Sequence, residues 1–227
     1  MNPMNQPTPQ GAVASFFAEL NELRWDDHRY YHQSRINQTL HFISSISFLT
    51  AYVMLFINPG VAALIGWGIG MVSRQSGHFF FEPRDYDHIN KATHEHKEEI
   101  KVGYNLNRKR VLHGIWAAIP IALYFDPTFF GTMTAYTDFN GFLNNMAIAW
   151  LILGVTALLF RTFHLFFIRD VKTGIAWCVK ILTDPFHDCK IYMKSPIYLM
   201  RGQLMDPMTH AVSSHPDEID QDCDARS

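Results

Sequence analysis

The chain has 227 residues, with 19 Lys and Arg against 21 Asp and Glu, and a formal net charge of −2. This near balance provides no broad basic surface, so nucleic acid is excluded as a partner. The number of cysteines is odd and no CxxC pair occurs, which predicts free thiols rather than a disulfide framework or zinc ribbon for Cys178, Cys189 and Cys223.

Charged residues are strongly segregated along the chain. None occurs in 36–73, and 111–160 contains only Asp126 and Asp138. A soluble helix needs one polar face, so uncharged runs of this length are typical of membrane proteins. The pattern predicts an all-α integral membrane bundle of about four transmembrane helices, preceded by an amphipathic helix and covered by a His-rich cytoplasmic cap.

The amino-terminal region is expected to lie outside the membrane. Residues 1–12 are polar and rich in Pro and Gln, and they contain no apolar segment of the signal-peptide kind. We expect a disordered leader here, with membrane insertion directed by the first internal hydrophobic helix. Residues 13–34 are expected to form an interfacial helix, whose apolar side consists of Phe16, Phe17, Leu20 and Leu23.

The membrane domain is expected to cover 13–205 as one unit. Asn58-Pro59-Gly60 interrupts the first uncharged run, which predicts a turn between two antiparallel spans. Each span needs roughly 20 residues, so the spans are placed at about 38–57, 61–81, 111–130 and 142–167. Residues 82–110 form a polar central segment, and 206–227 are expected to be an acidic, disordered tail.

The basic residues predict the orientation of the spans. Lys and Arg occur in the amino-terminal segment, the central segment and the tail, whereas the turn at 58–60 and the loop at 126–141 contain none. Arg74 and Arg161 lie within spans, each towards the same end. By the positive-inside rule both termini are cytoplasmic, in the inner membrane of a bacterium or the endoplasmic reticulum of a eukaryote.

The twelve histidines are gathered on this same side. Apart from His210 and His215 in the tail, they lie in cytoplasmic segments or near cytoplasmic helix ends. A simple interfacial preference would populate both faces, so the one-sided distribution predicts a metal site. On a helix His94 and His96 would point in opposite directions, so one of them is expected to be a ligand. The candidate ligands are His28, His32, His41, His78, His88, His94, His96 and His113.

Spacing constrains how the first three candidates can meet. His28 and His32 are four residues apart and would share one face of a helix. His41 follows His32 by nine residues, roughly half a turn out of phase on a continuous helix. His32 and His41 can therefore bind one metal only if the chain bends near 35–37.

Two motifs resemble a known family. The segment from His32 to His41 fits a His-x4-Asn-x3-His pattern at the entry to the hydrophobic hairpin, which ends in Gly77-His78-Phe79-Phe80-Phe81-Glu82. Over about residues 25–84 the chain resembles the Mpo-like membrane proteins. The characterised fungal member of that family is an iron(II)-dependent dioxygenase of 2-hydroxy fatty acids, which shortens its substrate by one carbon.

The resemblance implies roles for five residues. It implies that His32, His41 and His78 bind iron and that Asn37 and Glu82 support them. The chain departs from the family pattern after Glu82, where 83–110 brings three further histidines. Whether the site holds one or two Fe(II) ions therefore stays open.

The expected function is an iron-dependent membrane oxygenase that uses dioxygen on a lipid or fatty acyl substrate. The planar guanidinium of Arg35, Arg74 or Arg84 would suit the substrate carboxylate. One alternative is a di-iron lipid hydroxylase, although the HxxHH boxes of that class are absent. Another is a non-enzymatic metal- or haem-binding subunit of a larger complex, and homo-oligomer formation stays open.

Overall fold

The computed structural model describes residues 9–208, and within them the chain folds into helices joined by loops, which confirms the all-α prediction. The elements are α1 (Pro9–Tyr31), α2 (Arg35–Met54), α3 (Pro59–Ala63), η1 (Leu64–Met71), α4 (Val72–Ser76), η2 (Gly77–Phe81), α5 (His94–Ile100), α6 (Leu106–Phe125), α7 (Phe139–Ile168), α8 (Val171–Tyr192) and α9 (Ser195–Met200).

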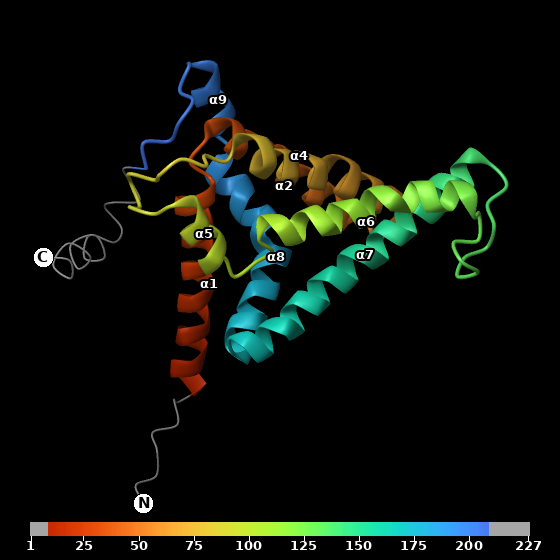
Figure 1. The fold of residues 1–227 in the computed structure, drawn as a ribbon, viewed down its shortest axis with the longest axis horizontal. Coiled ribbons are helices and arrows are strands. Elements are labelled where there is room, and N and C mark those ends of the chain that lie inside the picture. Colours follow the sequence, from red (N-terminus) through yellow and green to blue (C-terminus); the bar gives the residue numbers. More distant parts are fainter. Residues whose placement is uncertain (1–8, 209–227) are drawn as a thin grey trace, which may run out of the picture.

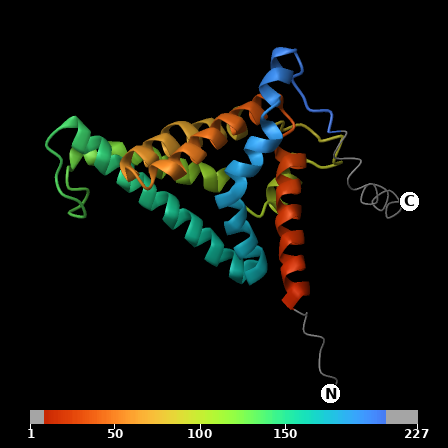
Figure 2. The same ribbon diagram turned by 180° about the vertical axis from the view of Figure 1, so that it is seen from behind.

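The helices form two arms that meet at one corner (Figures 1 and 2). In one arm α1 runs beside α8. In the other arm α2, the run from α3 to η2, and α6 lie roughly parallel to one another, and α2 starts where α1 ends. Helix α7 crosses between the arms and packs against α3, α6 and α8. The corner where α1, α2 and α8 meet therefore brings together segments far apart in the sequence.

The hairpin predicted around Asn58 is present. The Asn58 side chain accepts a hydrogen bond from the Val61 amide at 3.1 Å, and Pro59 occupies the first turn, where a missing N–H costs nothing. From Pro59 to Phe81 the chain is helical, but η1 and η2 have π-helical hydrogen bonding. Such segments are frequent at functional sites, and η2 contains His78.

The third predicted span ends earlier than expected. Helix α6 stops at Phe125 rather than near residue 130. The Asp126 carboxylate accepts hydrogen bonds from the amides of Thr128 and Phe130, at 2.9 and 2.7 Å, and holds a turn there. Pro127 has no N–H to continue the helix, so the chain must leave it at this point. The fourth predicted span, 142–167, lies within α7.

Only α7, among the helices of residues 9–208, is by itself both long and apolar enough to cross a membrane. The other predicted spans differ for physical reasons. The α3 to η2 run is divided by its changes of hydrogen-bonding register. Helix α6 has three basic residues among its first five, and α2 carries many polar side chains.

Helix α2 buries its polar side and exposes its apolar side. Asn37, Gln38 and His41 are completely buried, as are two of its serines. By contrast, Ile46 and Val53 are 46% and 63% exposed. This arrangement is the reverse of that in a soluble helix, which buries its apolar stripe.

The carboxyl-terminal segment corrects one expectation. Residues 1–8 and 209–227 lie outside the described part, and with them most of the predicted leader and tail, Cys223, and the last two histidines. Asp206, however, is buried and contacts α2: its carboxylate accepts from Gln38 Nε2 at 2.9 Å and pairs with Arg35 at 3.0 Å. The disordered tail therefore does not begin at Asp206, because this carboxylate neutralises a buried cation. Cys178 and Cys189 are free thiols, as predicted.

Close packing between α2 and η2 gives the first testable prediction. A Cβ atom added at Gly77 would overlap the Asn37 side chain, which is buried and hydrogen-bonded to the Tyr31 carbonyl at 2.8 Å. Gly77→Ala should therefore push η2 away from α2 and lower the free energy of unfolding by about 1–3 kcal/mol. Thermal or denaturant unfolding of the purified protein measures this.

Gly68→Ala is the matched control. Nothing lies within 4 Å of a Cβ added at Gly68, on the same helical run. This variant should be as stable as the parent or up to about 1 kcal/mol more stable, since alanine favours helix. Equal destabilisation by the two changes would contradict the packing argument.

Candidate metal centre

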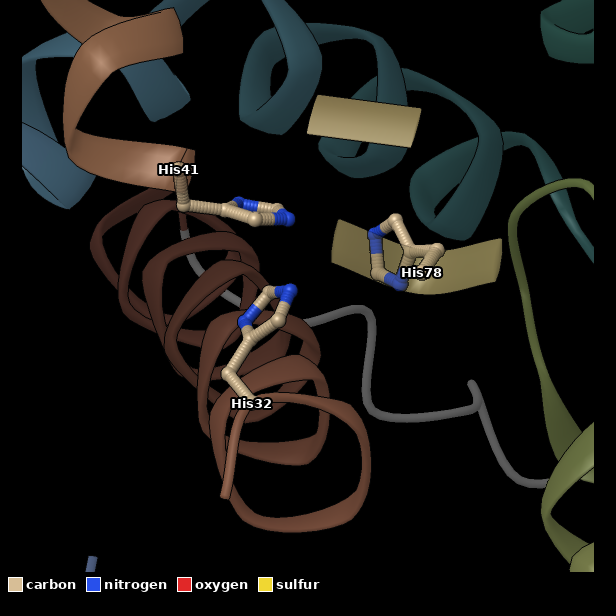
Figure 3. A group of neighbouring side chains, drawn as sticks. All are labelled: His32, His41 and His78. Carbon is tan, nitrogen blue, oxygen red and sulfur yellow. The ribbon is translucent and has the colours of Figure 1, made fainter. Parts of the chain in front are cut away.

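Three histidines from separate segments meet at the corner of the fold. His32 lies in the link after α1, His41 is on the second turn of α2, and His78 is in η2. The chain bends between His32 and His41, as their spacing required, but the bend lies at residues 32–34 rather than at 35–37. The Ser34 side chain caps α2, so residues 35–37 are already helical. Figure 3 shows the three imidazole rings facing a common space. One potential ligand atom of each ring lies within 4.8 Å of the others, so the three could hold a metal ion.

The free ring nitrogens favour a metal at this point. Nε2 of His32 and Nε2 of His41 are buried and have no hydrogen-bond partner. A buried nitrogen without a partner is costly, because it loses its hydrogen bonds with water. A metal ion accepting both lone pairs would remove this cost. Burial also holds the pKa of His32 well below its usual value, and the resulting neutral ring is the form that binds metal.

The other nitrogen of each ring faces an oxygen. Nδ1 of His32 lies 2.8 Å from the Tyr192 hydroxyl, Nδ1 of His41 lies 3.4 Å from Asp188 Oδ2, and Nδ1 of His78 lies 2.7 Å from Glu82 Oε2. If each Nδ1 carries the proton and donates it to this oxygen, each Nε2 presents a lone pair. Metal-binding histidines characteristically have such a partner, which fixes the ring and increases its basicity.

Tyr192 links the triad to a fourth histidine. Its hydroxyl lies 3.0 Å from Nδ1 of His28 as well as near His32. Burial and the nearby Asp188 raise the pKa of Tyr192 well above its usual value, so the hydroxyl keeps its proton. It can accept from His32 and donate to His28. His28 therefore lies behind the ligands, although its spacing had made it a ligand candidate.

A cluster of buried charges holds Asp188. Arg74 pairs with Asp188 at 3.1 Å and with Asp184 at 3.4 Å. Lys180 in turn contacts Asp184 at 2.7 Å and also pairs with Asp27. Because each charge is opposed by another, the cluster can stay ionised away from water. It fixes the carboxylate that faces His41.

The three arginines expected to bind a substrate carboxylate are engaged elsewhere. Arg74 belongs to the charge cluster just described. Arg35 pairs with Asp206, donates to Gln38 at 2.8 Å and stacks over a tyrosine ring. Arg84 is exposed and donates to the Phe79 carbonyl at 2.9 Å. Their guanidinium groups support the protein structure, since the binding partners lie within the chain.

The two expected supporting residues act in different ways. Glu82 contacts a ligand directly through the hydrogen bond to His78. Asn37 contacts the Tyr31 carbonyl and lies against Gly77, so it sets the spacing between α2 and η2 rather than the direction of a ring.

The remaining candidate ligands are not part of the triad. Among residues 9–208, His32, His41 and His78 form the one group of three or more potential ligands. His88 and His96 are exposed, and His94 is half-buried at the start of α5. His113 lies on α6, with Nδ1 2.6 Å from the Lys109 carbonyl oxygen.

The residues that the sequence reasoning missed lie on α8. Lys180, Asp184, Asp188 and Tyr192 recur every four residues, so they share one face of that helix. All four are buried and point towards the charge cluster or the triad. This polar stripe was visible in the sequence, but nothing there showed that it faced the histidines.

Tyr192→Phe should weaken metal binding. The change leaves His28 and His32 without their shared buried partner and frees the His32 ring to rotate. Loss of such a partner typically lowers metal affinity by about 10–100-fold. Competition with a chelator of known affinity measures the change.

Tyr198→Phe provides the control for this experiment. It removes the same hydroxyl from the tyrosine ring on α9 that stacks under Arg35. Metal affinity should stay at the parental value. An unchanged affinity in Tyr192→Phe would show that the hydroxyl does not position His32.

Comparison of the chain with protein-family models, curated proteins and solved structures gives no match. The function of the triad is therefore inferred from its own geometry and chemistry.

Proposed function

We propose that this protein is an iron(II)-dependent membrane oxygenase whose substrate is a fatty acid or acyl lipid, most specifically a 2-hydroxy fatty acid. The observation that carries the proposal is the buried triad of His32, His41 and His78, with each Nδ1 facing an oxygen and two Nε2 atoms without partners. Three protein ligands leave coordination positions open, as a catalytic metal requires.

The exposed apolar surface supports a membrane location. Side chains that would be buried in a soluble protein are exposed along α2, α6 and α7, including Val53 at 63%, Ile121 at 61% and Phe167 at 87%. The polar residues of α2 face inwards instead. A lipid environment accounts for both features, because only there is an apolar exterior stable. We place α2, the α3 to η2 run, α6 and α7 across the membrane, with both termini cytoplasmic.

Iron(II) is the metal that fits the proposed reaction. Three imidazoles suit either iron or zinc, but only iron would supply the redox chemistry needed to use dioxygen. A 2-hydroxy fatty acid and one dioxygen balance to a fatty acid one carbon shorter, carbon dioxide and water. The substrate provides all the electrons, so this reaction needs no separate reductant. The protein side chains hold the metal, exclude water and orient the acid.

Lys109 is the cation that we assign to the substrate carboxylate. Burial raises the pKa of Glu82, and the charges of Lys101 and Lys109 oppose this effect, so both lysines lie near the His78 side of the triad. Lys101 is already paired with Glu98 at 3.2 Å. The half-buried Lys109 ammonium has no ion-pair partner within residues 9–208, which leaves it available to an anionic ligand.

Metal analysis tests the proposal directly. The protein purified in detergent and reconstituted anaerobically with iron(II) should hold about one iron per chain, since residues 9–208 contain one three-histidine group. His41→Ala and His78→Ala should each lose most of it, together with dioxygen-dependent shortening of 2-hydroxypalmitate. Elemental analysis and product mass spectrometry provide the two measurements.

His96→Ala is the control, because His96 is exposed and outside the triad. It should keep both metal and activity. About two irons per chain would favour the di-iron alternative. Zinc bound tightly to the purified protein would favour hydrolytic chemistry. Bound iron without any turnover would favour a non-enzymatic subunit. If the parent protein binds no metal, the proposal fails.

Lys109→Met tests the carboxylate contact. Loss of a charge-assisted hydrogen bond should weaken binding of 2-hydroxypalmitate about tenfold or more, while the iron content stays the same. Arg110→Met removes a neighbouring exposed charge and should leave the affinity near the parental value. Equal affinities in the two variants would place the carboxylate elsewhere.

A further inference from the structure

A second polar site lies where α5, α6 and α7 meet. It is a cavity of about 210 Å³, smaller than the roughly 300–1,000 Å³ of pockets for drug-sized ligands. None of the triad histidines lines it. Its basic lining residues are Lys101, Arg108, Arg161 and Arg169.

Arg161 is the buried part of this site. It lies within α7 and is only 3% exposed. Its guanidinium donates to the carbonyls of Val102 and Gly103, both at 3.1 Å, and lies 2.8 Å from Nδ1 of His164. These neighbours are dipoles and not anions. Within the described chain no carboxylate pairs with Arg161, so a buried positive charge is solvated but not neutralised.

Two further arginines extend this positive charge to the surface. Arg108 and Arg169 are exposed, and within residues 9–208 neither has an ion-pair partner. Two glutamates also line the cavity, but Glu98 is already used: it pairs with Lys101 at 3.2 Å and accepts from the Leu106 amide at 2.6 Å. Only the exposed Glu99 remains, so the cavity has an excess of positive charge.

We propose that this cavity binds the phosphate group of an anionic ligand through Arg108, Arg161 and Arg169. Planar guanidinium groups match the tetrahedral oxygens of phosphate and can bind them in pairs. An anion here would also supply the negative charge that the described part of the chain does not provide for Arg161. Leu165 and Ile168 line the cavity beside the arginines, so apolar surface adjoins the charged part.

A phosphate group could come from two sources. One is the headgroup of a phospholipid whose acyl chains lie along α7, and the other is a soluble phosphate ester. Both present the same oxygens to the arginines, and binding experiments separate them. The three proposed phosphate ligands are separate from the metal centre, because none of them makes a hydrogen bond or ion pair with the triad histidines or their oxygen partners in residues 9–208.

Binding is tested on delipidated, detergent-purified protein with two probes. In the first experiment, the unfolding temperature is measured as inorganic phosphate is added. Chloride at the same ionic strength is the control. Phosphatidic acid is compared with diacylglycerol, which has the same acyl chains but no phosphate, and retained lipid is counted by native mass spectrometry. Phosphatidic acid binding alone identifies a lipid headgroup, and binding of both probes or of inorganic phosphate alone identifies a site open to soluble phosphates.

The double variant Arg108→Gln, Arg169→Gln should bind about tenfold or more weakly to whichever probe binds the parent protein. The reason is that each arginine contributes a charge-assisted contact. Both positions are exposed, so the fold should survive. Arg110→Gln removes a positive charge from the exposed side of the same helix, outside the cavity, and should bind like the parent. The proposal is overturned if neither probe binds the parent protein above its control, or if the double variant binds as tightly as Arg110→Gln.

Discussion

Hydrogen bonds from outside the ligand set hold the imidazoles of the triad. Tyr192 and Asp188 on α8 face His32 and His41, and Glu82 faces His78. Without these oxygens each ring could rotate, and its proton could occupy either nitrogen. The contact between α2 and α8 therefore does more than join two helices. Together with the contact of Tyr192 to His32 in the link before α2, it decides which nitrogen of His32 and His41 points into the shared space, and so whether the three rings can act together.

The same contact explains the buried charges beneath the site. The Asp188 carboxyl group is buried beside His41, and an isolated anion there would be unstable in the interior. Arg74, Asp184 and Lys180 provide alternating charges around it. Removal of Arg74 would leave the buried Asp188 without its cation, at a cost of about 3–5 kcal/mol. Arg74 on α4 is therefore occupied by these carboxylates, and an anionic substrate must use a different cation.

Much of the fold could be predicted from local chemistry. The turn at Asn58-Pro59, the helical character of the uncharged runs and the break before α2 all depend on neighbouring residues, and the structure has them. The end of α6 was misplaced by five residues because apolar residues continue past Pro127, although the backbone cannot remain helical there. The role of Asp206 was missed because its buried partner, Arg35, lies 171 positions earlier in the chain.

The sequence by itself determined which histidines were candidates and that His32 and His41 needed a bend between them, because ring type and helical phase are local properties. It contained the stripe of Lys180, Asp184, Asp188 and Tyr192, but it could not show which helix this stripe faces. The resemblance had already grouped His78 with the first two histidines, but only the tertiary structure brings the three rings together and pairs Arg74 with Asp188. The tertiary structure also placed Arg161 beside Arg108 and Arg169 around one cavity. The physical reason is that partner choice between distant segments depends on how the helices pack, and packing is a property of the whole chain.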